Sequence, residues 1–387
     1  MTIFRLHRSF VVACIGTVLI GCASLHTERV IRVRDTDWTT YGGSTERSNR
    51  SRTTLTPPLT LRWKYDAAAG FGSGSPVAAD SLVFVGTLQG ELHAVHIKTG
   101  ERVGYKSFES AIVGAPVIDG NTLIVTSALD KPTLIAYNVH LASVTWSRDL
   151  GPIETSPLLV GNRLIVTTLA GSVVCVDKSN GEELWNFEAE EQIHSSPASD
   201  GTLVVFGCDD GSVYALSISD GSILWRMRTQ GSVFAPPTIR GTTVFIGSTD
   251  NTFSAISLMD GTLKWKREIG SRIYGGAACS DDLVYIGAAN GTLYALDVSD
   301  GTTRWSFKTK SVINSAPLVA GEIVYVGSLD TFLYAIDAHT GQSLWEYRTK
   351  GRIKTSLALW GDYLIVASED KFLYAFQPAP APGRLER

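Results

Sequence analysis

The chain has 387 residues and a formal net charge of −4 at pH 7, from 34 basic and 38 acidic residues. A mildly acidic protein whose charges are scattered lacks the concentrated basic surface that nucleic-acid binding requires. We therefore expect no nucleic-acid partner.

Residues 1–21 are predicted to be a signal peptide. Arg5 and Arg8 precede an apolar run of secretory-signal length, too short to span a bilayer comfortably. The run ends in "LIGC" (residues 19–22), which resembles the bacterial lipobox. The resemblance implies cleavage before Cys22 and its modification with fatty acids such as palmitate, and several acyl chains give a stable anchor. Ala23 after the cysteine favours the outer membrane. The alternative is an ordinary signal peptide with a chance cysteine.

The stretch that follows, residues 22–56, is polar and short of residues that could form a core. It includes "STERSNRSRTT" at 44–54. We predict a lipid-anchored tether between the membrane and a folded domain.

A repeat of 40 residues occupies most of the remaining chain, and tryptophans mark its period. Eight units cover residues 59–376. Each unit contains four short runs of alternating apolar and polar residues, rich in β-branched and aromatic side chains and bounded by Gly or Asp. Four antiparallel strands in every 40 residues are typical of a β-propeller blade.

The two ends of the repeat predict how the ring closes. The last unit stops after its third strand, whereas "LTLRWKYD" (59–66) is a fourth strand without the first three. The N-terminal strand should therefore complete the last blade and remove an exposed sheet edge. We predict an all-β, eight-bladed propeller of four-stranded blades over residues 57–377, and a disordered Pro/Ala tail at 378–387.

The repeated tryptophans are predicted to dock neighbouring blades, where a large ring buries much apolar area and its N–H finds a partner. An aromatic ligand site is the alternative, but it suits one special tryptophan better than a set spread around the ring. The set is Trp63, Trp146, Trp185, Trp225, Trp265, Trp305 and Trp345.

We find no catalytic motif such as GxSxG, HExxH, a P-loop or CxxC. His93 and His96 resemble a metal-binding pair, but an i, i+3 pair on a strand points to opposite faces. We expect neither catalytic residues nor a metal site.

One position of the repeat varies in a way that suggests binding. It lies three residues before the proline of each first strand, so its residues should ring one mouth of the central channel. Chemical diversity at one position of a repeat is where a function can be placed. The alternative is that residues surrounded by water vary freely. The predicted ring is Ser73, Val113, Glu154, His194, Phe234, Tyr274, Asn314 and Lys354.

The pattern "LYALDVSDGTTRW" (293–305) strongly resembles the repeat of the pyrroloquinoline quinone (PQQ) enzymes, over nearly all of the mature chain. PQQ dehydrogenases carry an adjacent-cysteine disulfide, a calcium ion and catalytic carboxylates. This chain has no Cys-Cys pair and no inserted loops to cover a quinone, and the calcium ligands cannot be assigned to it. We expect no cofactor.

The lipobox, the tether and a repeat that ends after a third strand resemble the BamB family of outer-membrane lipoproteins. The resemblance implies a monomeric, non-enzymatic propeller that faces the periplasm and docks on a BamA-like subunit of the β-barrel assembly machine. The loops that correspond to the family's partner-binding surface, residues 188–195 and 228–235, are shorter here and different in sequence.

Three functions stay open at this point. The first is an assembly scaffold that offers loops and strand edges to a membrane partner, with β-augmentation as one mode. The second is a PQQ-dependent oxidoreductase. The third is a propeller that binds a small ligand or the cell wall at its channel mouth.

Overall fold

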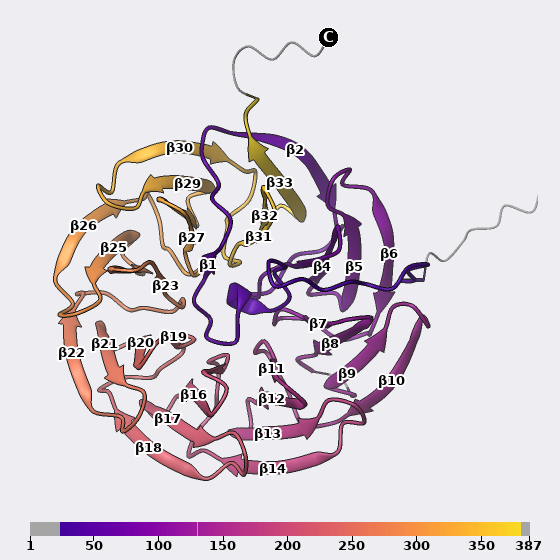
Figure 1. The fold of residues 1–387 in the computed structure, drawn as a ribbon, viewed down its shortest axis with the longest axis horizontal. Coiled ribbons are helices and arrows are strands. Elements are labelled where there is room, and N and C mark those ends of the chain that lie inside the picture. The colour runs from indigo at the N-terminus through magenta and orange to yellow at the C-terminus, as the bar shows by residue number, and fades with distance from the viewer. Residues whose placement is uncertain (1–23, 130, 381–387) are drawn as a thin grey trace, which may run out of the picture.

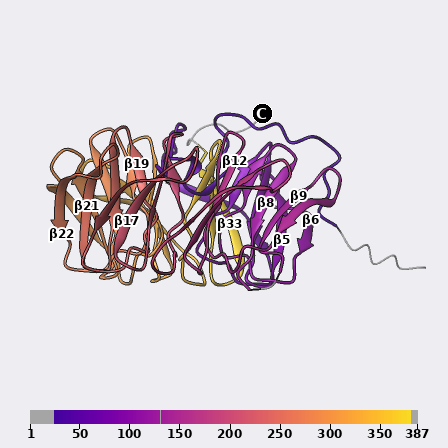
Figure 2. The same cartoon turned by 90° about the horizontal axis from the view of Figure 1, so that it is seen from below.

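The computed structural model describes residues 24–129 and 131–380. Eight sheets stand around a central axis (Figure 1) and form a flat disc in side view (Figure 2). The predicted all-β, eight-bladed propeller is confirmed. Among the described residues, no helix is long and apolar enough to cross a membrane. The expected signal peptide, Cys22 and residues 381–387 of the expected tail lie outside the described residues.

Each blade contributes an inner strand near the axis, two middle strands and an outer strand at the rim (Figure 1). We number the blades 1 to 8 in chain order. The inner strands are β3 (Val77–Ala79), β7 (Val117–Asp119), β11 (Leu158–Val160), β15 (Ala198–Ser199), β19 (Thr238–Arg240), β23 (Ala278–Cys279), β27 (Leu318–Ala320) and β31 (Ala358–Trp360). The second strands are β4 (Leu82–Gly86), β8 (Thr122–Thr126), β12 (Arg163–Thr167), β16 (Leu203–Gly207), β20 (Thr243–Gly247), β24 (Leu283–Gly287), β28 (Ile323–Gly327) and β32 (Tyr363–Ala367). The third strands are β5 (Glu91–His96), β9 (Leu134–Asn138), β13 (Ser172–Asp177), β17 (Ser212–Ser217), β21 (Thr252–Ser257), β25 (Thr292–Asp297), β29 (Phe332–Asp337) and β33 (Phe372–Pro378). The outer strands are β6 (Arg102–Ser107), β10 (Ser143–Arg148), β14 (Glu183–Glu188), β18 (Ile223–Arg228), β22 (Leu263–Glu268), β26 (Thr303–Lys308), β30 (Ser343–Arg348) and β2 (Leu59–Asp66).

The ring closes in blade 8 as the sequence predicts. There β2, from the N-terminal part of the chain, pairs antiparallel with β33, from Leu59 opposite Pro378 to Asp66 opposite Phe372. The seam therefore joins the two ends of the repeat by a full strand pair, and β33 is left without a free edge.

The tryptophan and the glycine of the repeat form one joint between neighbouring blades. The Trp225 indole nitrogen of blade 4 donates a hydrogen bond to the Leu258 carbonyl of blade 5, at 2.8 Å. Gly261, in the same turn of blade 5, has φ +72°, and a Cβ there would lie 2.8 Å from the Trp225 ring. The same N–H···O bond recurs as Trp63 to Ile97, Trp146 to Lys178, Trp185 to Ile218, Trp265 to Val298 and Trp305 to Ala338.

Two blades depart from this joint. Trp345 of blade 7 is only half-buried, because blade 8 takes its outer strand from the N-terminus and has no turn between its third and outer strands. In blade 1 the place of the tryptophan, opposite Ala94, is held by Gly104. A Cβ on Gly104 would lie 3.0 Å from the Cα of Leu25, which is fully buried. Leu25 therefore occupies the joint between blades 1 and 2.

The structure differs from the expected tether over residues 24–56. This segment lies across one face of the propeller and enters the central channel (Figure 1). Its side chains Trp38, Tyr41, Arg47 and Leu55 are at most 5% exposed. It contains the short 3₁₀-helix η1 (Tyr41–Gly43) and β1 (Arg50–Ser51), which pairs parallel with β27. The segment is part of the fold, because its backbone supplies partners that the blades lack.

Residues 37–51, which we call the collar, follow the inner strands around the channel. An inner strand has one edge that faces the channel, and buried backbone N–H groups on that edge need acceptors. Collar carbonyls accept hydrogen bonds from the inner strands of blades 1, 2, 4, 5, 6 and 7. These donors are Ala78 N to Trp38, Ile118 N to Thr39, Ser199 N to Thr45, Ile239 N to Glu46, Cys279 N to Ser48 and Val319 N to Asn49, at 2.8–3.1 Å.

Side chains extend the collar to the two remaining blades. The Arg47 guanidinium donates to the Pro157 carbonyl of blade 3 at 2.9 Å, and the Trp360 indole of blade 8 donates to Asp37 at 2.7 Å. Arg47 also donates to the carbonyls of Pro197 and Tyr41 and to the Thr40 hydroxyl. Burial lowers the pKa of Arg47 to about 10, which still leaves it charged at neutral pH.

We expect Arg47→Met to lower the free energy of unfolding by about 3 kcal/mol. The change leaves three buried carbonyls without their donor, at roughly 1–3 kcal/mol each, partly offset by not burying a charge. Urea unfolding followed by tryptophan fluorescence measures this. Arg50→Met is the matched control, because Arg50 is an exposed collar residue paired with exposed Asp281, and we expect a loss under about 1 kcal/mol. Equal losses for the two variants would contradict the role given to Arg47.

Candidate functional site

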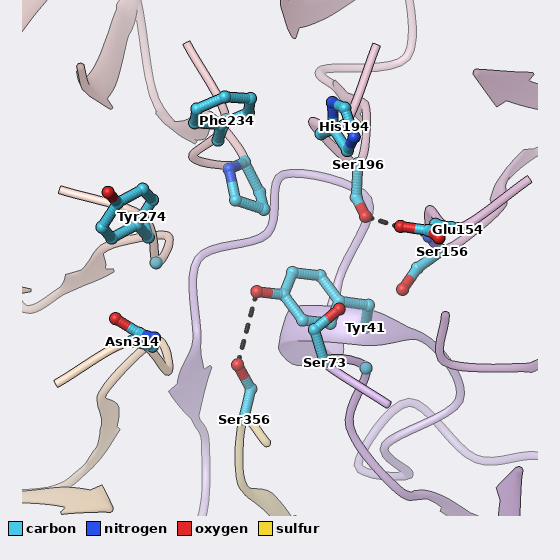
Figure 3. A pocket seen from close by; sticks show the side chains of 13 residues that line it. Tyr41, Ser73, Glu154, Ser156, His194, Ser196, Phe234, Tyr274, Asn314 and Ser356 are labelled. Carbon is cyan, nitrogen blue, oxygen red and sulfur yellow. Dashed lines mark hydrogen bonds between the residues drawn. The ribbon is translucent and has the colours of Figure 1, made fainter. Parts of the chain in front are cut away.

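A cavity of about 310 Å³ opens at one mouth of the channel. Its lining includes six of the eight residues of the predicted ring, which approach the axis from different blades (Figure 3). They are Ser73, Glu154, His194, Phe234, Tyr274 and Asn314. Val113 and Lys354 do not line the cavity. The Val113 carbonyl accepts a hydrogen bond from the Gly74 N–H, and the Lys354 ammonium lies 3.3 Å from the Glu369 carboxylate.

The collar closes the inner end of this cavity. Tyr41 is part of the lining, and its hydroxyl lies 3.3 Å from the Ser356 hydroxyl (Figure 3). Burial raises the pKa of Tyr41, so the phenol stays protonated at neutral pH. Sequence reasoning missed Tyr41, because the segment that carries it reads as a tether. It also missed Ser156, Ser196 and Ser356, although all three lie two residues after a ring position.

One wall of the cavity is aromatic. The His194 and Phe234 rings meet edge to face with centroids 5.3 Å apart, and the Phe234 and Tyr274 rings stack at 6.1 Å. The Nδ1 atom of His194 lies 3.0 Å from the Asp209 carboxylate, which fixes the direction of the imidazole. Glu154, from the neighbouring blade, lies beside His194 and across the cavity from Tyr274 (Figure 3).

PQQ is the cofactor to test, because the repeat resembles that of the PQQ enzymes. The residues that line the cavity do not suit it. PQQ carries three carboxylates and needs cationic partners. The cavity is lined by the carboxylate of Glu154, and none of the described residues that line it is a lysine or an arginine. In residues 24–129 and 131–380, no three His, Cys, Asp or Glu side chains gather in a way that could hold a metal ion such as calcium. His93 and His96 have separate local partners: His93 bonds with Tyr65 and Glu91, and His96 with Thr99.

The loops of residues 188–195 and 228–235 lie beside a charged cluster between blades 3 and 4. The Arg226 guanidinium bonds to the Glu190 carboxylate at 2.5 and 2.8 Å and also to Asp210. Arg228 lies 3.1 Å from the same Glu190 carboxylate. The Arg226 hydrogen bond lowers the pKa of Glu190. Glu190, with 56% of its side chain exposed, is thus held at the surface by two arginines.

The closed ring and its Trp–Gly joint define the class of the protein as an eight-bladed propeller of PQQ-type repeats. A family model described as "Outer membrane protein assembly factor BamB" matches residues 59–170, 169–273 and 265–381. These matches cover most of the chain, which therefore belongs to the BamB family, a family of outer-membrane protein assembly factors.

Two curated relatives carry the same name. The chain is 29% identical over 151 residues to BamB of Burkholderia pseudomallei, covering 37% of this chain and 39% of that protein. It is 32% identical over 129 residues to BamB of Xanthomonas campestris pv. campestris, covering 30% of this chain and 31% of that protein. The matched part thus spans less than two fifths of the length of either relative.

Solved structures share the fold. BamB from Moraxella catarrhalis superposes with a TM-score of 0.69 at 20% identity, over 82% of this chain and 99% of that one. Quinohemoprotein alcohol dehydrogenase from Comamonas testosteroni gives a TM-score of 0.76 at 15% identity, over 91% of this chain and 82% of that one. Likeness to an assembly factor and to an oxidoreductase alike shows that the fold does not decide the activity.

Proposed function

We propose that this protein is a lipid-anchored, non-enzymatic scaffold that assists the assembly of outer-membrane β-barrel proteins through protein–protein contacts. The family match across residues 59–381 carries the proposal. The lipobox that ends at Cys22 supports an outer-membrane lipoprotein facing the periplasm. We also propose that the propeller is monomeric and that its partner is a BamA-like subunit.

We propose that the partner contacts the loops of residues 188–195 and 228–235. Arg226 and Arg228 hold Glu190 in place at this surface, so a partner would meet charged groups that are already ordered. Groups fixed before binding lose less conformational entropy on association. The surface also lies at the junction of two blades, where one partner can contact both loops at the same time.

We expect Glu190→Arg to abolish capture of the β-barrel subunit from detergent-solubilised envelopes, because it places a third cation beside Arg226 and Arg228. Glu183→Arg makes the same change of charge on the exposed outer strand of the same blade, and we expect it to capture normally. Melting curves check that both variants are folded. Equal capture by both variants would exclude this surface, and failure of the unaltered chain to capture any β-barrel subunit would refute the proposed function.

We propose that the protein works without PQQ. A ligand that binds only the folded state must raise the melting temperature. We expect no rise when PQQ and calcium are added to the purified chain, because Glu154 repels a tricarboxylate. A rise, together with dye reduction, would favour the oxidoreductase over the scaffold.

A further inference from the structure

The first described residues are fixed to the rim of the propeller at the junction of blades 1 and 2. Leu25 N donates to the Tyr105 carbonyl of β6 at 2.9 Å, and the Tyr137 hydroxyl of β9 donates to the Leu25 carbonyl at 2.6 Å. Thr27 N donates to the Val139 carbonyl at 2.9 Å. With the Leu25 side chain buried in the place that tryptophan takes in other blades, the segment joins both blades.

This attachment lies close in sequence to Cys22. Only Ala23 lies between Cys22 and Ser24, which forms a bridge with Tyr105. The two Cα–Cα steps from Cys22 to Ser24 reach about 7 Å when the chain is extended. Acyl chains on Cys22 would therefore hold this part of the rim at the membrane surface. A long flexible tether would instead let the disc turn freely.

We infer that the rim at the junction of blades 1 and 2 lies against the phospholipid headgroups, so that the disc stands on its edge on the membrane. The inference rests on the acylation of Cys22 that belongs to the proposed function. It assigns the lipid surface to the rim formed by β6 and its neighbours. The rim of blades 5 and 6, across the ring, then points away from the membrane (Figure 1).

The outer strands at this rim combine cations with aromatic rings. The Lys106 ammonium lies 5.9 Å from the centroid of Phe108, and the Arg102 guanidinium lies 5.6 Å from that of Tyr105. On the adjoining β2, the Lys64 ammonium lies 4.8 Å from the Phe372 centroid. Aromatic rings and long cationic side chains are typical of the membrane interface, where the cations attract anionic headgroups.

The experiment compares one reporter on each side of the ring. Ser107→Cys places a thiol on β6, beside the attachment, and Ser306→Cys places one on β26 of blade 6; both serines are exposed. The native Cys175, Cys208 and Cys279 are buried, and burial raises their pKa values to about 12, 11 and 12, so they resist labelling. Each variant is purified as the acylated chain, labelled with a fluorophore and reconstituted in phosphatidylethanolamine–phosphatidylglycerol vesicles that contain a headgroup quencher.

We expect strong loss of fluorescence at residue 107 and none at residue 306. A second pair of variants carries a ten-residue Gly/Ser insertion between Ala23 and Ser24, which adds a reach of about 17 Å. We expect this insertion to reduce the difference between the two reporters. If the chain without the insertion floats with the vesicles but its two reporters are quenched equally, the proposed edge-on orientation is wrong. The lipid anchor on Cys22 would still stand. Failure to float would refute the anchor, and with it the inference.

Discussion

Deleting residues 59–66 should destabilise the whole propeller. The deletion removes β2, exposes the edge of β33 and takes away Trp63, which is 9% exposed and bonded to blade 1. Truncating one buried tryptophan costs about 3–5 kcal/mol. Losing the strand that carries it should approach the 5–15 kcal/mol by which domains of this kind are stable.

Thermal unfolding followed by circular dichroism measures the effect, and size-exclusion chromatography reports any association through the exposed edge. Removal of residues 381–387 is the control at the other end of the chain, and we expect it to leave the melting curve unchanged. A deletion of 59–66 that melts like the intact chain would show that the seam does not hold the ring closed.

Trp225→Ala, Trp265→Ala and Trp305→Ala should each lower the free energy of unfolding by about 3–5 kcal/mol, the usual cost of truncating a buried tryptophan. All three indole rings are at most 9% exposed, and each donates to a carbonyl of the next blade. The losses should be similar because the three joints are built alike. Chemical denaturation at a temperature where the ring stays closed gives the values.

Trp345→Ala is the matched control for this series. Trp345 is half-buried beside the seam and contacts no turn of the type that Trp225 contacts. We therefore expect Trp345→Ala to lower the free energy of unfolding by less than the other three substitutions do. Capture of the partner should survive in every variant that remains folded. A loss at Trp345 as large as at the other three positions would contradict the joint as the source of stability.

The ring could be predicted because each blade is a local pattern repeated at a fixed period. Trp225 and Gly261 recur at the same offset in most blades, and the missing fourth strand of the last unit predicted the seam. Around the candidate site, the register of the repeat placed six ring residues at the cavity. Lys354 does not line the cavity as predicted, because its ammonium pairs with the carboxylate of Glu369. The repeat register does not predict this pairing, because Glu369 lies outside the ring position.

The collar could not be predicted from composition. Its contacts with the blades are mostly through backbone carbonyls, which any residue supplies, so polar residues such as Thr45 and Glu46 serve as well as apolar ones. Arg47 is buried by hydrogen bonds rather than by apolar character. One signal was present in the sequence: Gly104 interrupts the series of tryptophans, and the gap needs another side chain to fill it.

The collar and the seam also determine the order in which the chain can fold during its synthesis. Residues made first depend on residues made last, since Arg50 pairs with Val319 and Leu59 with Pro378. Contacts so distant in sequence form slowly, because a long loop must close before they give any stabilisation. The N-terminal segment that contains Arg50 and Leu59 therefore lacks its pairing partners until the C-terminal strands have been synthesised. During that interval unpaired strands are open to aggregation, so maturation of this propeller should depend on factors that hold the chain extended until its last blade is available.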